Sequence, residues 1–285
     1  MQHNSKNIAV VCNQLAGSGR AVALAEKIAE DLYNKDIPHS LFKENWPPEF
    51  NDFTDVWIVG GDGTLNYFVN YYPDIIRPLV IFNGGTGNDF HWMLYGKINF
   101  EDQVQLALSA EPKPIDLGRC NEKYFINGVG VGFEGVVAKS LTGKKKKAGK
   151  ASFMAMILKK IFLYRSKTYR IITDDKTIAE KKYFIIDISN GSRAGGGFHI
   201  APQAEPDDGL FDIVIIDALR PLNRLRWLPF IEKGRHLNLS FVNYSKVKKI
   251  SIESNESILF HLDGEYFEAT KLDVDLIPGK LLFRY

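Results

Sequence analysis

The sequence predicts a chain of two parts: an α/β domain built on a parallel sheet, then a mainly β domain. The first prediction depends on apolar, β-branched runs that each lead into a glycine-rich turn and a helical stretch, because this alternation is typical of parallel α/β sheets. The second depends on a change after about Pro114, where short strand-like runs separated by turn residues dominate. The length of 285 residues also favours two domains.

In the first part, residues 8–12 form an apolar run typical of a buried strand. The glycine turn AGSGR follows and leads into a helix over about 21–34, with Leu24, Ile28 and Leu32 spaced by four on one face. Further elements are expected as strands at 39–42, 56–59 and 79–82 and as a helix at 65–72. Because glycine turns follow three of these strands, we expect a ligand site at the carboxyl ends of the sheet.

In the second part, turn residues separate a series of short runs, which predicts a β-sandwich or a curved antiparallel sheet. The expected strands are 124–127, 169–173, 183–189, 210–216, 248–254 and 272–276, and the expected helices are 148–164 and 220–233. We therefore predict a nucleotide-type domain over 1–117 and a β-rich domain over 118–280. The last residues, 281–285, form another strand that could return to the first domain.

The composition limits the partners and the cellular location that we expect for the protein. The net charge is only +2, so the total implies no strongly acidic or basic partner, and we expect no nucleic-acid binding. The two cysteines, Cys12 and Cys120, fit no metal spacing and indicate a reduced, cytoplasmic protein. The polar start lacks the apolar core of a signal peptide, and the longest apolar stretch, 153–163, is too short to span a bilayer.

Three glycine loops carry the clearest chemical signal: 16–20, 60–64 and 84–89. Glycine lets the backbone approach a ligand closely, and successive N–H groups at a helix start can then point at phosphate oxygens. Plain tight turns would also explain any one of these loops. None of them is a dinucleotide G-x-G-x-x-G fingerprint or a Gly-Lys-Ser/Thr P-loop, so a phosphate ligand would be held in another way.

Two of the loops also carry a resemblance to a known family. The Val-Gly-Gly-Asp-Gly-Thr run at 59–64 resembles the nucleotide loop shared by diacylglycerol, sphingosine and ceramide kinases, NAD kinases and phosphofructokinases. The Asn-Gly-Gly-Thr-Gly-Asn-Asp-Phe run at 83–90 is more specific, since it is similar to the second signature of the diacylglycerol kinase catalytic domain and its bacterial lipid kinase relatives. Further ordered matches are Asp-Leu-Gly at 116–118, the segments 195–202 and 207–212, and Asp-Gly-Glu at 263–265.

This resemblance implies an NAD kinase/diacylglycerol kinase-like fold and an ATP-dependent kinase of a membrane lipid, with diacylglycerol or a related lipid as acceptor. It implies ATP and Mg²⁺ as cofactors, because Mg²⁺ bridges phosphate oxygens in phosphoryl transfer. The residues that it places at the nucleotide are Asn13, Gly17, Gly19, Arg20, Gly60, Gly61, Asp62, Gly63, Thr64, Gly85, Thr86 and Asn88. The family usually has Asn-Pro where this chain has Asn13-Gln14, so the first loop lacks the fixed φ of proline.

The carboxylates expected at the cleft are Asp62, Asp263 and Glu265. By resemblance, Asp263 is the general base that engages the lipid hydroxyl, although Asp-Gly between apolar runs is also a common hairpin turn. Asp62 is the alternative base, or a ligand of the catalytic Mg²⁺. Asp89 and Asp116 are expected to link the cleft to the metal through hydrogen bonds, and otherwise to be a helix cap or strand-end residues.

A second, structural Mg²⁺ is implied in the segment EPDDGLFDI, where bacterial relatives hold the ion with acids and a backbone carbonyl. The corresponding residues are Glu205, Asp208 and the carbonyl of Leu210. Hard oxygen ligands suit Mg²⁺. The family often has Asp where Glu205 stands, and a solvated turn would also explain the segment.

The lysine-rich and apolar stretch 144–167 has the composition of a membrane-surface element, although a solvated loop before a core helix explains it equally well. We therefore expect peripheral contact with the inner membrane face, and the family makes a homodimer plausible. Two other functions stay open. One is an NAD kinase-like kinase of a soluble acceptor, and the other is a non-catalytic protein that binds nucleotide or lipid.

Overall fold

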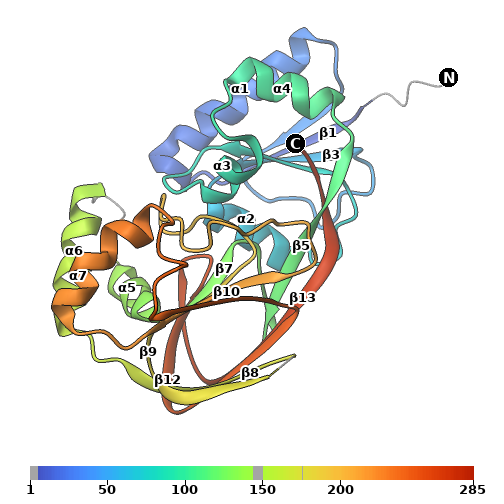
Figure 1. Cartoon of the computed structure of the whole chain (residues 1–285). Coiled ribbons are helices and arrows are strands. Elements are labelled where there is room, and N and C mark those ends of the chain that lie inside the picture. Colours follow the sequence, from blue (N-terminus) through green and yellow to red (C-terminus); the bar gives the residue numbers. More distant parts are fainter. Residues whose placement is uncertain (1–5, 144–149, 175) are drawn as a thin grey trace. The chain divides into compact units, whose positions relative to one another are not determined.

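A computed structural model of the chain describes residues 6–143, 150–174 and 176–285 (Figure 1). The chain divides into two compact units. The first comprises residues up to Asp116 together with Pro278–Tyr285, and the second comprises Leu117–Ile277. The division lies beside Leu117, and the segment that returns to the first unit starts at Pro278 rather than at 281.

The first unit is built on a parallel sheet, which confirms the predicted α/β class. Its strands are β1 (Ile8–Cys12), β2 (His39–Phe42), β3 (Asp55–Gly60) and β4 (Leu79–Asn83), in the order β2-β1-β3-β4. The end of β13 (Glu265–Arg284) joins this sheet, where Phe283 pairs in parallel with Leu79. Every residue of β1 and β3 is buried, as expected for strands covered on both faces.

Helices pack on this sheet. They are η1 (Ala16–Gly19), α1 (Arg20–Asn34), α2 (Asp62–Tyr71), α3 (Asp89–Tyr95) and α4 (Phe100–Ser109). Of these, α1, α2 and α3 begin within or directly after the glycine loops of the sheet. Ile28 and Leu32 of α1 are fully buried in the core, and Leu24, expected on the same face, is partly buried against it. Helix α2 begins at Asp62 rather than at 65, so the segment GGDGT is half loop and half helix. The sequence analysis had predicted neither α3 nor α4.

The second unit is mainly antiparallel β, as predicted. Its strands run in the order β11-β10-β9-β7-β12-β13, and β8 pairs with both β9 and β12. The bounds are β5 (Pro112–Cys120), β6 (Lys123–Phe125), β7 (Gly128–Gly132), β8 (Lys167–Thr173), β9 (Thr177–Ser189), β10 (Phe211–Asp217), β11 (Val242–Val247) and β12 (Lys249–Leu262). Strands β5 and β13 each run from one unit into the other. Cys12 and Cys120 are buried and reduced.

Three helices of the second unit are α5 (Phe133–Leu141), α6 (Lys150–Leu163) and α7 (Pro221–Glu232). Helices α6 and α7 lie side by side (Figure 1). The buried Arg224 of α7 joins them, because its guanidinium donates to the carbonyls of Ile161 and Tyr164 at 2.9 and 2.8 Å. Across the described ranges, none of the helices combines the length and the apolar character needed to cross a bilayer.

Candidate active site

In the first unit, the three predicted glycine loops meet at one edge of the sheet. The registers Cys12↔Val59 and Gly60↔Asn83 bring the carboxyl ends of β1, β3 and β4 level with one another. The N–H of Gly84 donates to the carbonyl of Gly60 at 2.8 Å, so the second and third loops continue the sheet pairing past the strand ends.

Glycine is needed where these loops touch. A Cβ on Gly85 would lie 2.4 Å from Cα of Gly61, and a Cβ on Gly17 would lie 2.2 Å from the carbonyl oxygen of Gly84. Each of these distances is far below van der Waals contact, and the opposing atoms are backbone atoms that cannot turn away. The loops therefore pack backbone against backbone, which leaves their N–H groups close together.

Polar side chains tie the loops to each other. Asn13 Nδ2 donates to Thr64 Oγ1 at 3.2 Å, and Arg20 Nη2 donates to the carbonyl of Gly85 at 2.8 Å. Asn88 closes its own loop, since its side chain accepts from the N–H of Gly85 and donates back to the carbonyl of the same residue. These three residues, expected at the nucleotide, thus also hold the loops in place.

Two helices begin at this edge after glycine caps. Gly19 precedes α1 and Gly61 precedes α2. Because glycine has no side chain, neither cap residue supplies a side-chain acceptor for the first N–H groups of its helix, and these groups carry the positive end of the helix dipole. Four of the residues expected at the nucleotide are exposed here, namely Gly19, Arg20, Gly63 and Thr86. Such an edge suits an anion, and phosphate groups in particular.

Asp62 contacts Asp89, and Asp116 is buried on β5. The carboxylate of Asp62 accepts from the N–H groups of Asp89 and Phe90 at 3.1 and 3.0 Å, so it caps α3. Asp116 is buried on β5 and accepts from the N–H of Gly279 on β13 at 2.7 Å. The geometry thus gives Asp62 and Asp116 structural tasks in addition to those expected from the sequence.

In the second unit, Asp263 and Gly264 form the tight turn between β12 and β13. The φ angles of the two residues are 48° and 88°, as in the turns preferred by β-hairpins. The Asp263 carboxylate accepts from the N–H groups of Ile126, Asn127 and Gly128 at 2.8, 2.8 and 3.0 Å. The Asp-Gly pair was expected to be either a hairpin turn or the site of a general base. This geometry is compatible with both, since the hairpin turn carries an oriented carboxylate. Glu265 follows as the exposed first residue of β13.

A polar cluster that the sequence patterns do not predict lies beside this turn. Gly130 of β7 pairs with Asp187 on β9 and with His261 on β12, and Glu134 reaches the same place from α5. The available signal was the alternation in GVGVG, which leaves one face of a strand without side chains.

The expected structural metal loop is occupied by a lysine. Asp208 Oδ1 accepts from the N–H of Leu210 at 2.9 Å, and Asp208 Oδ2 lies 2.5 Å from Lys246 Nζ. The same ammonium lies 3.6 Å from Oδ2 of Asp212, whose side chain is fully buried. Within the part of the chain that the structure describes, no three acidic, His or Cys side chains are grouped to hold a metal ion. As arranged, Glu205, Asp208 and Leu210 do not fit a second Mg²⁺.

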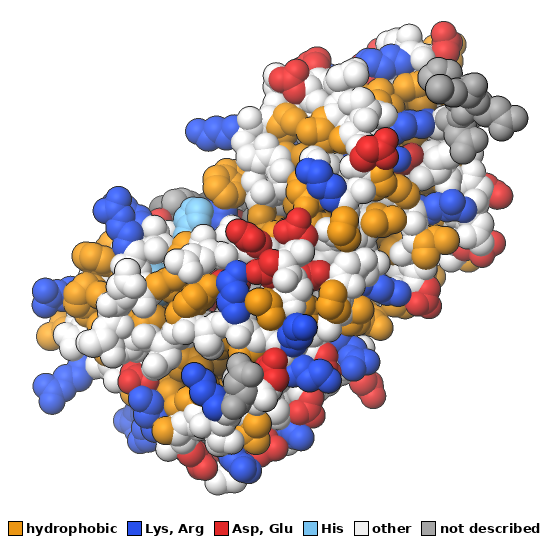
Figure 2. Space-filling model, turned by 45° about the vertical axis from the view of Figure 1, so that its right-hand side comes forward, with side chains coloured by type: hydrophobic (Ala, Val, Ile, Leu, Met, Phe, Trp, Pro, Cys, Tyr) orange, Lys and Arg blue, Asp and Glu red, His pale blue; other side chains and the backbone are white. Residues whose placement is uncertain are grey.

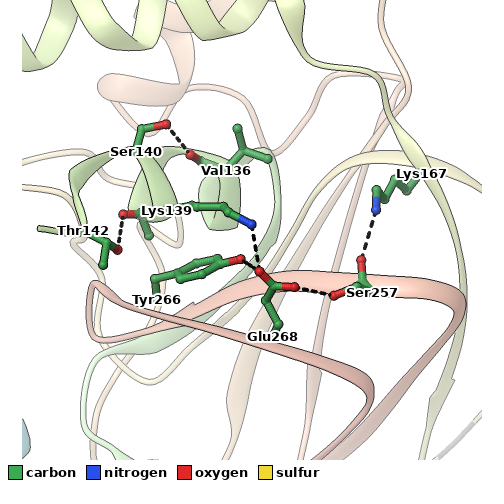
Figure 3. Close-up of polar contacts among 9 residues, drawn as sticks. Val136, Lys139, Ser140, Thr142, Lys167, Ser257, Tyr266 and Glu268 are labelled. Atoms are coloured by element: carbon green, nitrogen blue, oxygen red, sulfur yellow. Dashed lines mark hydrogen bonds and ion pairs between the residues drawn. The ribbon is translucent and has the colours of Figure 1, made fainter.

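An exposed polar cluster joins α5 to β12 and β13 (Figure 3). Glu268 accepts from Lys139 Nζ and from Ser257 Oγ, each at 2.8 Å, and from the hydroxyl of Tyr266. These donors, Lys139 first, lower the pKa of Glu268 to about 2. Lys139 also borders a hollow of about 570 Å³ between α5 and α6, which Ser140, Thr142, Ala155, Met156, Lys159 and Lys160 line as well.

Comparison with known families agrees with both units. The diacylglycerol kinase catalytic domain matches residues 7–120, and the YegS C-terminal NAD kinase beta sandwich-like domain matches residues 127–283, more than half of the chain. The chain belongs to the diacylglycerol kinase family of lipid kinases. It is therefore a phosphotransferase, as the glycine loops and the Asp-Gly-Glu motif predict.

Named relatives and solved structures are consistent with this assignment. The kinase is 30% identical over 229 residues to a probable lipid kinase YegS-like of Chromohalobacter salexigens, covering 78% of this chain and 73% of the relative. It is 29% identical over 241 residues to a diacylglycerol kinase of Bacillus subtilis, covering 82% and 76%. A crystal structure of a diacylglycerol kinase from Bacillus anthracis has the same fold, with a TM-score of 0.73 at 20% identity over 100% of this chain and 98% of that one. An ATP-bound NAD kinase from Archaeoglobus fulgidus shares the fold more distantly, with a TM-score of 0.56 at 16% identity over 98% and 93%.

Proposed function

We propose that this kinase transfers the γ-phosphoryl group of ATP to the hydroxyl of a membrane lipid, with diacylglycerol or a closely related lipid as the acceptor. The observation that carries the proposal is the edge of the first unit, where three glycine loops pack backbone against backbone below two glycine-capped helices. Its N–H groups can receive a triphosphate, and membership of a lipid kinase family supplies the class of acceptor.

The N–H groups of the first turns of α1 and α2, together with the loop around Thr86, would hold the phosphates. Mg²⁺ bound with the triphosphate would neutralise charge on the phosphate oxygens. Arg20 and Asn13 would keep the loops at their spacing, through the bonds to Gly85 and Thr64. Most of the catalytic effect would then come from positioning and charge, as is usual for phosphoryl transfer.

Asp263 would receive the proton of the lipid hydroxyl while the hydroxyl oxygen forms its bond to the γ-phosphorus and ADP leaves. Three backbone N–H groups fix the orientation of this carboxylate, which is what a base needs in order to meet one particular hydroxyl.

Access to the lipid would come from contact between the second unit and an anionic membrane surface. Residues 144–149 of the lysine-rich stretch lie outside the described residues, but α6 and α7 present exposed apolar side chains at Phe162, Leu163 and Leu222. Lys159 and Lys160 border the hollow between α5 and α6. Lys and Arg side chains lie beside hydrophobic ones at the left-hand edge of Figure 2, the side on which α6 and α7 lie in Figure 1. This mixture suits the interface of a bilayer.

A phosphorylation assay with γ-labelled ATP, Mg²⁺ and a panel of lipids in mixed micelles tests the proposal. We expect the label to partition into chloroform with one lipid class. The Asp263→Asn variant should be slower by about 10²–10⁴-fold, because a general base is removed, while ATP affinity measured by calorimetry stays unchanged.

Other outcomes of the assay would contradict the proposal. Label transferred to NAD, which stays in water, would indicate a kinase of a soluble acceptor. Binding of ATP without turnover on any acceptor would indicate a regulatory protein. If Asp263→Asn kept full activity, Asp263 would not be the base, and Asp62 would be the candidate for that role.

A further inference from the structure

The space beside Gly130 brings together side chains from two different elements of the second unit. A Cβ on Gly130 would lie 2.3 Å from Glu134 Oε2 and also 2.3 Å from His261 Nε2, so both atoms point into the volume that glycine leaves empty. Glu134 can approach because Gly135 lets α5 lie directly on β12, where a Cβ would come within 2.1 Å of the carbonyl oxygen of Leu259.

Glu134 shares a proton with Asp187, which is only 1% exposed. The two carboxyl groups hydrogen-bond to each other, and two carboxyl groups can do so only when one of them is protonated. Desolvation raises the pKa of Asp187 to about 7, and desolvation followed by the charge of Asp187 raises the pKa of Glu134 well above its usual value. Asp187 also accepts from the hydroxyl of Ser189. Among the described residues, Glu134 Oε2 has no hydrogen-bond partner, and it borders the same space beside Gly130 as His261 Nε2.

His261 connects this pair to the Asp-Gly turn. The N–H of Gly264 donates to His261 Nδ1 at 3.3 Å, which makes Nδ1 the acceptor and assigns the single ring proton to Nε2, on the side of Glu134. Desolvation lowers the pKa of the imidazole to about 4, so the ring stays neutral at the pH of the cell. A second nitrogen proton would abolish the bond to Gly264, because Nδ1 could no longer accept.

The same turn carries Asp263, which is anchored at the start of β7 by its carboxylate and by its own N–H, a donor to the Gly128 carbonyl at 3.0 Å. The turn is thus held on one side by β7 and on the other by His261. We infer that Glu134, through the proton that it shares with Asp187, keeps His261 in the Nε2–H form, and that His261 thereby positions the Asp263 carboxylate for proton acceptance. Glu134 and His261 are positioning residues, and their link to catalysis rests on the proposed role of Asp263.

Two isosteric substitutions of His261 separate this inference from a merely structural role. In His261→Asn, the amide oxygen stands near the place of Nδ1 and can accept from Gly264, whereas in His261→Gln the amide lies one methylene farther along, near the place of Nε2. We expect His261→Asn to keep kcat within about 3-fold of the unmodified kinase. His261→Gln should lose at least about 10-fold, with KM for ATP unchanged, because a small misplacement of a reacting group is costly. Equal kcat values for the two variants would overturn the inference.

Glu134 offers a second matched pair. Glu134→Gln keeps an amide that can donate to Asp187 and place an oxygen near His261, so its kcat should stay near that of the unmodified kinase. Glu134→Ala removes both groups and should resemble His261→Gln. Melting temperatures of all four variants show whether each is folded, and a folded Glu134→Ala with full activity would contradict the inference.

The state of the His261 ring gives a readout that needs no activity. Nitrogen-15 NMR of the imidazole at neutral pH should show the Nε2–H form in the unmodified kinase and a mixture of both forms in Glu134→Ala. If no lipid is phosphorylated but the ring shows this pattern, the proposed function fails and the positioning of the turn stands. If lipid is phosphorylated but the proton is on Nδ1, the positioning inference alone fails.

Discussion

At Asp263, the backbone and the side chain make different demands on the residue type. A φ of 48° favours glycine, asparagine or aspartate, whereas three N–H donors call for a side chain with two acceptor oxygens. Aspartate meets both demands. Asp263→Asn is still a better probe than an alanine variant, since asparagine keeps the turn conformation and one acceptor oxygen. It removes the carboxylate, and its amide group then faces an N–H that the second oxygen of Asp263 accepts from.

Asp187 gives the clearest pH dependence at the scale of a single residue. Its pKa is raised from 3.8 to about 7 in the folded protein, so between these values the folded state retains a proton that the unfolded state releases. The free energy of unfolding should therefore decrease as the pH rises through this window. The titratable groups that face Asp187 are Glu134, Asp212 and His261. All three are unchanged in the variants compared below.

Asp187→Asn removes that proton equilibrium, so we expect its melting temperature to vary less between pH 4 and pH 7 than that of the unmodified protein. Calorimetry at several pH values measures the difference, with the exposed Asp52→Asn as the control. An identical pH profile for Asp187→Asn and the unmodified protein would show that Asp187 is ionised in the fold.

At the scale of elements, the strand ends and the glycines that follow them form one unit of structure. The sequence predicted the strands and the loops, because apolar runs and glycines are local signals. It could not show that Asp62 caps α3 or that Arg20 bridges two loops, since these contacts join residues 27 and 65 positions apart. Helix α2 also begins earlier than predicted, because the three glycines of GGDGT lower the apparent helix propensity of this segment.

Gly85 and Gly63 test the backbone packing as a matched pair. In Gly85→Ala, the new Cβ would meet Cα and N of Gly61 at 2.4 and 2.8 Å, so we expect a loss of about 2 kcal/mol or more in the free energy of unfolding and weaker ATP binding. In Gly63→Ala, the Cβ meets nothing within 4 Å, and alanine favours the first turn of α2 by up to about 1 kcal/mol. Thermal melting without nucleotide compares them, and equal melting temperatures would contradict the packing argument.

The arrangement of the loop at 205–210 differs from the expected metal site because Lys246 comes from β11, a distant strand. Its ammonium stands between Asp208 and the buried Asp212, and the hydrogen bond to Asp208 is the first cause of its raised pKa. We expect the melting temperature of the unmodified protein without ATP to be the same in EDTA as in millimolar Mg²⁺.

Lys246→Met keeps the length of the side chain but removes its charge, so it should melt several degrees lower, because it leaves the buried Asp212 without its cation. Added Mg²⁺ should partly restore its stability, while Lys248→Met should show neither effect. If Mg²⁺ stabilised the unmodified protein and metal were found in the purified protein, a structural Mg²⁺ at this loop would be supported instead.

At the scale of the whole molecule, the order of motifs along the chain was enough to predict the family and both domain classes, and the comparisons confirm them. The positions of individual functional groups were less predictable. The cluster at Gly130 joins four elements, and its members, such as Glu134 and His261, are single polar residues in apolar surroundings that no local pattern distinguishes.

Membrane contact is also a property of the whole molecule, and vesicle sedimentation tests it. Each lysine near an anionic surface is worth about 1 kcal/mol, so Lys159→Gln with Lys160→Gln should weaken binding to vesicles rich in anionic phospholipid by roughly 10- to 30-fold. Lys27→Gln with Lys35→Gln, an equal change of charge on and just after α1, is the control. Unchanged binding of the first pair would exclude α6 as the contact.

The return of β13 to the first unit has a consequence for synthesis. Arg284 forms an ion pair with Asp55, whose side chain is fully buried at the start of β3. A ribosome makes Asp55 long before Arg284, and the entire second unit is translated between them. During that interval the nascent first unit lacks the ion-pair partner of Asp55, so the unit is expected to remain loosely packed until Arg284 emerges.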